Sequence, residues 1–249
     1  MKTFFFYLLT LSSVLFAKYD EVSLLDGWQE DNSVLKIWFT VLGLLDEVDR
    51  GSSSGFAIRF AQEGKYYDVL KGDNWWTYYF AFDSVGDITS KTIHRIPRYQ
   101  RSMIRFQTAC TMPEERGHEL LSKYMKLKPE ILERLELLKK EVRLGVYYQP
   151  ITSSEDLEAL YRLIAEEKEK IGVERIYLVT EVEALKERFR KECICLTGIQ
   201  GGDEELLAMY LFAGCDTLIA SGSYYSIGAK FLNPQLNVME LSPFPYLCK

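Results

Sequence analysis

The C-terminal half of the chain alternates short apolar stretches with amphipathic ones, and this alternation restricts the possible folds more than any other feature of the sequence. Strands are expected at residues 144–148, 175–180, 193–196 and 217–220, and segments with helical periodicity separate them. Strands that alternate with helices are typical of a parallel sheet covered by helices on both faces. The sequence therefore predicts a Rossmann-like α/β unit at residues 142–249.

A Ser-Gly-Ser turn follows the last of these buried strands. Ser221 and Ser223 come at the carboxyl end of the strand, and Ser226 lies in the first turn of the helix that follows. Open α/β sheets bind ligands at the carboxyl ends of their strands, and a helix N-terminus there presents N–H groups to a phosphate. Two interpretations remain open: a phosphate-binding turn, and a turn in which Ser221 only caps the helix.

Charge and composition argue against several functional classes. The net charge of −6 and the isoelectric point of about 5.2 argue against nucleic acid as a partner, because a phosphate backbone needs a broad basic surface. Basic residues gather only at residues 91–105, where a solvated face and an anion site are the alternatives. The five cysteines and two histidines show neither zinc-ligand spacing nor a His-based nucleophile pattern, so we expect no metal.

The first 17 residues are typical of an export signal. Lys2 provides a positive charge, residues 4–16 form an apolar run, and Ala17 offers a small residue for cleavage. The run is shorter than the stretch of about 20 residues that a membrane-spanning helix needs. We therefore expect an exported protein, periplasmic or secreted, with no stable membrane span after signal cleavage and a membrane anchor if the signal stays uncleaved.

The part of the chain that precedes the alternating pattern is less regular. A helix is expected at residues 34–45, a turn or short linker at 51–55, and a strand at 56–60. Two further helices, at residues 113–126 and 129–141, begin near prolines, which a first helical turn tolerates because its N–H groups are unpaired anyway. These segments predict a smaller N-terminal region that helices join to the Rossmann-like unit.

Aromatic side chains are dense at residues 66–80, where Trp75 and Trp76 directly follow Asn74. Tyrosine and tryptophan at this density usually form core. They also form surfaces that stack on sugars, because their faces match the apolar faces of pyranoses and their polar tips form hydrogen bonds. Both interpretations remain open from the residues alone.

The segment GDNWWTYYF at residues 72–80 resembles the G-x-N-W-W-x-Y-Y-F segment of bacterial proteins related to the nodulation fucosyltransferase, which fall within the fucosyltransferase-like GT-B glycosyltransferases. Residues 144–149, 176–181 and 215–234 are similar, in the same order, to further segments of that family. The resemblance covers about residues 34–241. It implies an α/β fold of the GT-B type, with two Rossmann-like lobes and parallel sheets, of which the N-terminal lobe is short and irregular.

The resemblance also implies an organisation and a function. After the signal, an acceptor-side lobe would span residues 18–112, a helical connector 113–141 and a donor-side lobe 142–249. The activity would be transfer of a fucose-like sugar from a nucleotide sugar such as GDP-fucose to a glycan acceptor, without a cofactor. The implied site residues fall into three groups: for donor binding Tyr147, Gln149, Ser221, Ser223 and Ser226; as catalytic carboxylates Glu181 and Asp83; and on the acceptor side Asn74, Trp75 and Trp76.

Several positions depart from the family pattern. The family's His-x-Arg is Tyr147-x-Gln149 here, and that arginine is thought to meet the donor diphosphate. Gln149 can donate hydrogen bonds but carries no charge, so the bidentate, charge-assisted contact is lost. The family's Asp after the next strand is Glu181, which keeps the charge. Three functions remain open: an active transferase, a catalytically degenerate exported protein that binds a glycan or nucleotide, and an exported interaction domain without a ligand.

Overall fold

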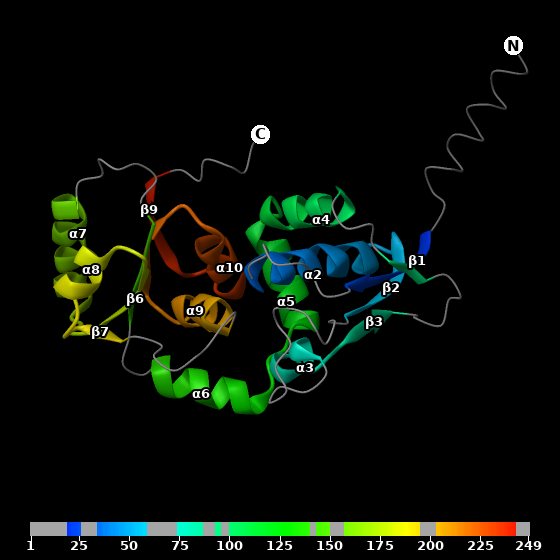
Figure 1. Ribbon diagram of the computed structural model, residues 1–249, viewed down its shortest axis with the longest axis horizontal. Coiled ribbons are helices and arrows are strands. Elements are labelled where there is room, and N and C mark those ends of the chain that lie inside the picture. The colour runs from blue at the N-terminus through cyan, green and yellow to red at the C-terminus, as the bar shows by residue number, and fades with distance from the viewer. Residues whose placement is uncertain are drawn as a thin grey trace, which may run out of the picture.

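The computed structural model describes residues 19–25, 34–58, 74–86, 93–95, 100–139, 143–149, 157–194 and 203–242 of the chain (Figure 1). These residues form two β-sheets in two lobes, with helices packed around them, so the predicted α/β class is confirmed. The predicted signal at residues 1–17 lies outside the described residues. Within the described ranges, no helix has the length and apolar character to cross a bilayer.

The C-terminal lobe contains a five-stranded sheet in which every strand pair is parallel, in the order β7-β6-β5-β8-β9. Its strands are β5 (Leu144–Tyr148), β6 (Ile176–Thr180), β7 (Cys193–Ile194), β8 (Thr217–Ser221) and β9 (Asn237–Ser242). Its helices are α7 (Leu157–Ile171), α8 (Glu183–Arg188), α9 (Asp203–Ala213) and α10 (Tyr224–Leu232). The predicted Rossmann-like unit is therefore confirmed, and its strand order reverses between β5 and β8.

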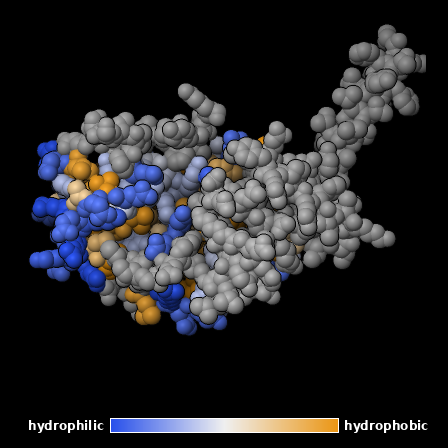
Figure 2. All heavy atoms as spheres, in the orientation of Figure 1, coloured by the Kyte–Doolittle hydropathy of each residue, from blue (hydrophilic) through white to orange (hydrophobic). Residues whose placement is uncertain are grey.

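Separate hydrophobic clusters cover the two faces of this sheet. Leu144 and Val146 of β5 pack with α7 and α8 on one face, and the exposed sides of these two helices make the hydrophilic surface at the left of Figure 2. On the other face, Gly145 leaves room for Phe212 of α9, whose ring would lie 2.6 Å from an added Cβ. Residues 206–212 of α9 are all buried, because this helix has neighbours on every side.

The N-terminal lobe has a four-stranded sheet in the order β3-β2-β1-β4, of which β3 is antiparallel. Its strands are β1 (Tyr19–Leu25), β2 (Ser53–Ile58), β3 (Ser84–Gly86) and β4 (Ile93–Arg95). The helices described between β1 and β5 are α2 (Val34–Asp49), α3 (Trp75–Tyr79), α4 (Gln100–Cys110), α5 (Glu114–Tyr124) and α6 (Pro129–Lys139). Strands of three residues and one antiparallel pair agree with the irregular lobe that was predicted.

One sequence-based prediction in this lobe needs correction. The turn or linker expected at residues 51–55 is only partly a turn, because β2 begins at Ser53 and Ser53 is buried.

The basic segment at residues 91–105, expected to be a solvated face or an anion site, is tested at one basic residue. Arg105 is buried and forms a two-pronged ion pair with Glu47, with N···O distances of 2.8 Å, so it belongs to neither. The other basic side chains of the segment lie outside those that the structure describes.

One hydrophobic core runs through both lobes. Helix α2 packs on α4 and α5 of its own lobe and also on α9 and α10 of the C-terminal lobe (Figure 1). Phe39 of α2 shows this directly, since its ring centroid lies 5.9 Å from that of Tyr224 and 6.1 Å from that of Phe231. Because α10 starts at the carboxyl edge of the C-terminal sheet, this core fixes the position of that edge relative to the N-terminal helices.

Candidate functional site

The carboxyl ends of β5 and β8 meet at the point where the strand order reverses. The backbone N–H of Gln149 donates a hydrogen bond to the hydroxyl oxygen of Ser221, with an N···O distance of 2.8 Å. In open α/β sheets, ligands bind in the crevice outside this switch point. The structure thus brings together two residues that the sequence predicted for donor binding, from segments 72 residues apart.

Ser223, and not Ser221, is the N-cap of α10. Its side-chain oxygen accepts a hydrogen bond from the N–H of Ser226, and the hydroxyl of Ser226 donates to the carbonyl of Ser223 at 2.8 Å. Ser221, Ser223 and Ser226 are all buried. The alternative in which Ser221 only caps the helix is therefore wrong. The turn also brings the N-terminal end of α10 close to Gln149, and the helix dipole favours an anion at that end.

Tyr147 orients the side chain of Gln149. The phenol of Tyr147 donates to Oε1 of Gln149 at 2.9 Å, and its ring lies 4.6 Å from the ring of Tyr225 on α10. Because the amide oxygen is occupied, the NH₂ group of this exposed glutamine is the part that can serve a ligand. Burial, with a smaller contribution from the charges of Glu181 and Glu205, raises the pKa of Tyr147, so its phenol stays protonated and can donate.

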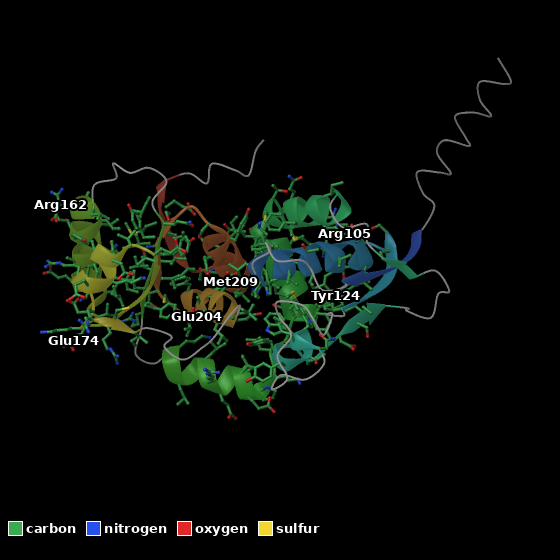
Figure 3. The ribbon with its side chains drawn as sticks, viewed as in Figure 1. Arg105, Tyr124, Arg162, Glu174, Glu204 and Met209 are labelled. Atoms are coloured by element: carbon green, nitrogen blue, oxygen red, sulfur yellow. The ribbon has the colours of Figure 1, made fainter. Side chains whose placement is uncertain are left out.

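Carboxylates surround this pair of tyrosines. Glu181 directly follows β6 and is exposed, whereas Glu204 and Glu205 lie in the first turn of α9, on which Figure 3 labels Glu204. Burial raises the pKa of Tyr225, and the charges of Glu205 and Glu204 raise it further. Within the described ranges, no group of three or more His, Cys, Asp or Glu side chains is arranged to hold a metal ion.

Arg143 is a basic residue of β5's own segment, but it does not compensate for the missing charge at Gln149. Arg143 directly precedes β5, at the amino-terminal edge of the sheet, where its guanidinium pairs with Asp216 and donates to the carbonyl of Ile171. That edge is opposite to the one at which Gln149 ends the strand. Arg143 therefore cannot take the place of the arginine that the family has near the diphosphate.

The two predicted catalytic carboxylates come from different sheets. Asp83 precedes β3 in the N-terminal lobe, where its carbonyl accepts from the N–H of Ile58 at 2.7 Å and its Oδ1 accepts from the hydroxyl of Ser84 at 3.1 Å. Glu181 stands at the carboxyl edge of the C-terminal sheet, near Tyr147. Of the two, Glu181 alone is placed with the donor-binding segments described above.

The Asn-Trp-Trp segment has a structural role. Asn74 is the N-cap of α3, with its Oδ1 accepting from the N–H of Trp76 and its Nδ2 donating to the carbonyl of Ile58 at 2.9 Å. Trp75 and Trp76 are 2% and 0% exposed, and Trp76 stacks on Phe80 with ring centroids 4.2 Å apart. Neither indole offers a face to a glycan in this structure, so the core interpretation of the aromatic run holds for both.

Two residues of the site were not predicted from the sequence. Glu205 and Tyr225 lie near Tyr147, each in the first turn of a helix that starts at the carboxyl edge of the sheet. The signal that could have identified them is their position, because the first turn after a parallel strand always begins at the ligand-binding edge. Their residue types alone gave no such indication.

The fold is that of the GT-B fucosyltransferases. No protein-family model and no curated protein matches the sequence. Among solved structures, the chain is similar to fucosyltransferase NodZ from Bradyrhizobium, with a TM-score of 0.58 and 16% identity over 90% of this chain and 96% of that one. For NodZ alpha-1,6-fucosyltransferase soaked with GDP-fucose, the TM-score is 0.56 and the identity 14%, over 88% of this chain and 94% of that one. For NodZ alpha-1,6-fucosyltransferase co-crystallised with GDP, the TM-score is 0.57 and the identity 16%, over 90% of this chain and 96% of that one. Similarity at this level of identity establishes the fold.

Proposed function

We propose that the protein is a glycosyltransferase-like protein that binds a nucleoside diphosphate sugar at the β5–β8 switch point and transfers a fucose-like sugar to a glycan. The observation that carries the proposal is the hydrogen bond from Gln149 to Ser221, because it joins the two predicted donor-binding segments at the ligand-binding edge of the sheet. The shared fold with structures that were solved with GDP and GDP-fucose supports the same class of ligand.

The chemistry of the transfer assigns roles to the side chains of this site. The acceptor hydroxyl must lose a proton to a base, and the departing diphosphate must be stabilised as its charge grows. Glu181, exposed and adjacent to Tyr147, is the carboxylate available as the base. The amide NH₂ of Gln149 and the N-terminal end of α10 provide the donors for the diphosphate.

We expect slow turnover because, within the described part of the chain, no positive charge is found at this point. The described residues that act electrostatically on Tyr147 and Tyr225 are carboxylates and a tyrosine, and Arg143 is held at the other edge of the sheet. A charged donor to a developing anion in a dry site contributes several kcal/mol to catalysis, and a neutral amide contributes less. We therefore expect donor binding with little transfer in the natural protein.

Calorimetric titration of GDP and GDP-fucose into the purified protein tests donor binding, and a donor-hydrolysis assay run alongside tests activity. Gln149→Arg should tighten GDP binding and create or raise turnover, because the charge-assisted contact is restored. Gln235→Arg, at an exposed position in the turn before β9, is the matched control and should change neither. If the unmodified protein binds neither GDP nor GDP-fucose, the proposed function is wrong.

A second function, a catalytically degenerate protein that binds a nucleotide or glycan, is favoured by a separate observation. The turn keeps both serines, Ser223 and Ser226, of the pattern that the sequence resembles. The neutral Gln149 stands where that pattern has an arginine, and the charges of Glu204 and Glu205 lie nearby. Binding of GDP-fucose without any turnover, even in Gln149→Arg, would select this function over the active transferase.

We also propose that the protein is exported, on the basis of the apolar run at residues 4–16. The test is expression of the full chain in a bacterial host, followed by fractionation and N-terminal sequencing of the product. Export with cleavage should yield a chain that begins at Lys18. A product that retains Met1 and stays in the cytoplasm would contradict the proposal.

A further inference from the structure

An acidic side chain at the proposed donor site has an oxygen without a hydrogen-bond donor. Oε2 of Glu205 is shielded from solvent, and no partner donates to it within the part of the chain that the structure describes. A buried acceptor without a partner costs about 1–3 kcal/mol, and a charged one costs more. Groups of this kind in native proteins call for an explanation, of which a ligand that supplies the missing donor is one.

Of the two phenols near Glu205, that of Tyr147 is not available to it as a donor. The charge of Glu205 contributes to the raised pKa values of Tyr147 and Tyr225, after burial, so it lies near both phenols. The phenol of Tyr147 is already committed, because it donates to Oε1 of Gln149 at 2.9 Å. Glu205 therefore lies near Tyr147, which holds the Gln149 side chain, and its Oε2 has no donor among the described residues.

The type of ligand group follows from the chemistry of a carboxylate. Glu205 repels a phosphate, so its partner must be an uncharged donor next to the diphosphate rather than the diphosphate itself. In a nucleoside diphosphate sugar, hydroxyl groups flank the diphosphate on both sides, on the ribose and on the transferred sugar. The rings of Tyr147 and Tyr225, 4.6 Å apart and only partly buried, add an apolar surface of the kind that packs against sugars.

We infer that Glu205 is a ligand-binding and specificity-determining residue whose Oε2 accepts a hydrogen bond from a sugar hydroxyl of the bound donor. This inference rests on the proposed function, since it assumes that a nucleoside diphosphate sugar occupies the switch point. It assigns to the first turn of α9 a role in recognising the sugar, while the first turn of α10 and Gln149 serve the diphosphate. Glu181, exposed after β6, keeps its separate role toward the acceptor.

The test compares Glu205→Gln with Glu166→Gln, which makes the same change at an exposed position of α7, outside the site. In calorimetric titrations, Glu205→Gln should weaken GDP-fucose binding roughly tenfold or more, as expected for loss of a hydrogen bond to a charged group. Glu166→Gln should leave it unchanged. Titration of GDP into Glu205→Gln identifies the hydroxyl. If the affinity for GDP falls as much as that for GDP-fucose, the hydroxyl belongs to the ribose. If only the affinity for GDP-fucose falls, it belongs to the transferred sugar.

Thermal unfolding without ligand separates this role from a structural one. Because Glu205→Gln removes an unpaired buried charge, the unliganded variant should be as stable as the natural protein or more so. A lower unfolding temperature in the unliganded Glu205→Gln protein, or full retention of GDP-fucose affinity, would overturn the inference while leaving the proposed function intact. Failure of the natural protein to bind GDP and GDP-fucose would overturn both.

Discussion

Carboxylates occur both at the junction of α2 and α5 and at the β5–β8 switch point, but their partners differ. At the junction, Asp46 and Asp49 accept from Arg116 at 2.9 and 2.8 Å, and Asp49 also accepts from Lys123 and Tyr124. At the switch point, Glu205 has an oxygen without a donor among the described residues. The carboxylates of the junction thus hold α2 and α5 together, whereas Glu205 at the switch point keeps an oxygen that we propose to serve a ligand.

The largest effect is expected from breaking the junction. Arg116→Ala would leave Asp46, whose side chain is 5% exposed, and Asp49 without their shared partner. Asp46 keeps its pair with Arg50, and Asp49 keeps its pair with Lys123. The loss of stability should be about 1.5–3 kcal/mol, the usual contribution of hydrogen bonds to charged groups. Urea unfolding should show this loss, and Arg190→Ala, which breaks an exposed pair with Glu187, should cost less than about 0.5 kcal/mol. Equal small losses in both variants would refute the structural role of the junction.

The contact between α5 and α10 should be the next most sensitive. A Cβ on Gly117 would lie 2.6–2.8 Å from ring atoms of Phe231, and a buried ring cannot move aside easily. Gly117→Ala should therefore destabilise the protein by about 1–3 kcal/mol, the usual cost of overpacking. Gly214→Ala is the control, because its Cβ would meet only the flexible end of Lys139. A Gly117→Ala protein as stable as Gly214→Ala would show that the two lobes are not packed as described.

Strong acid should weaken the junction of α2 and α5. Hydrogen bonds from Lys123 and then Arg116 hold the pKa of Asp49 well below its usual value. Since the folded pKa is lower than the unfolded one, the stability that this group contributes is fully present above the unfolded pKa of about 3.9. It is lost as the pH falls below that value toward the lower folded pKa. Asp49→Asn should flatten the dependence of stability on pH over that range, and an unaltered slope would contradict the assignment.

The smallest effect concerns the cap of α10. Ser223→Ala removes the N-cap acceptor and should cost about 1 kcal/mol of stability, even without a ligand. We also expect it to weaken GDP binding by about 1 kcal/mol, since the first turn of α10 would lose its fixed geometry. Thermal unfolding and calorimetry measure the two effects separately. If Ser223→Ala changed neither, the turn would not organise the site.

Much of the C-terminal lobe could be predicted from the sequence, because parallel strands buried on both faces give compact apolar runs. The prediction for β5 matches the observed strand, and that for β8 differs by one residue. The N-terminal lobe was less predictable. β1, β4 and α4 went unpredicted. A three-residue strand such as β4 and a helix with several polar residues such as α4 depend on tertiary partners rather than on local periodicity.

The candidate site was predicted in part for a related reason. Gln149 and Ser221 follow strands whose ends must share one edge, so their proximity could be expected before the structure was known. The sequence could not distinguish buried from exposed tryptophans, and Trp75 and Trp76 are core residues. Nor could it reveal the unpaired oxygen of Glu205, because the lack of a partner is a property of the packed structure.

Hydrogen–deuterium exchange with and without GDP-fucose tests most directly whether the C-terminal lobe binds the ligand while the N-terminal lobe supports it. The account predicts slower exchange at residues 144–149, 203–205 and 221–226 when GDP-fucose is bound, because these segments meet at the switch point. It predicts unchanged exchange in α2 and α5, whose charged groups are already paired. Protection confined to α2 and α5, with none at residues 221–226, would contradict the account.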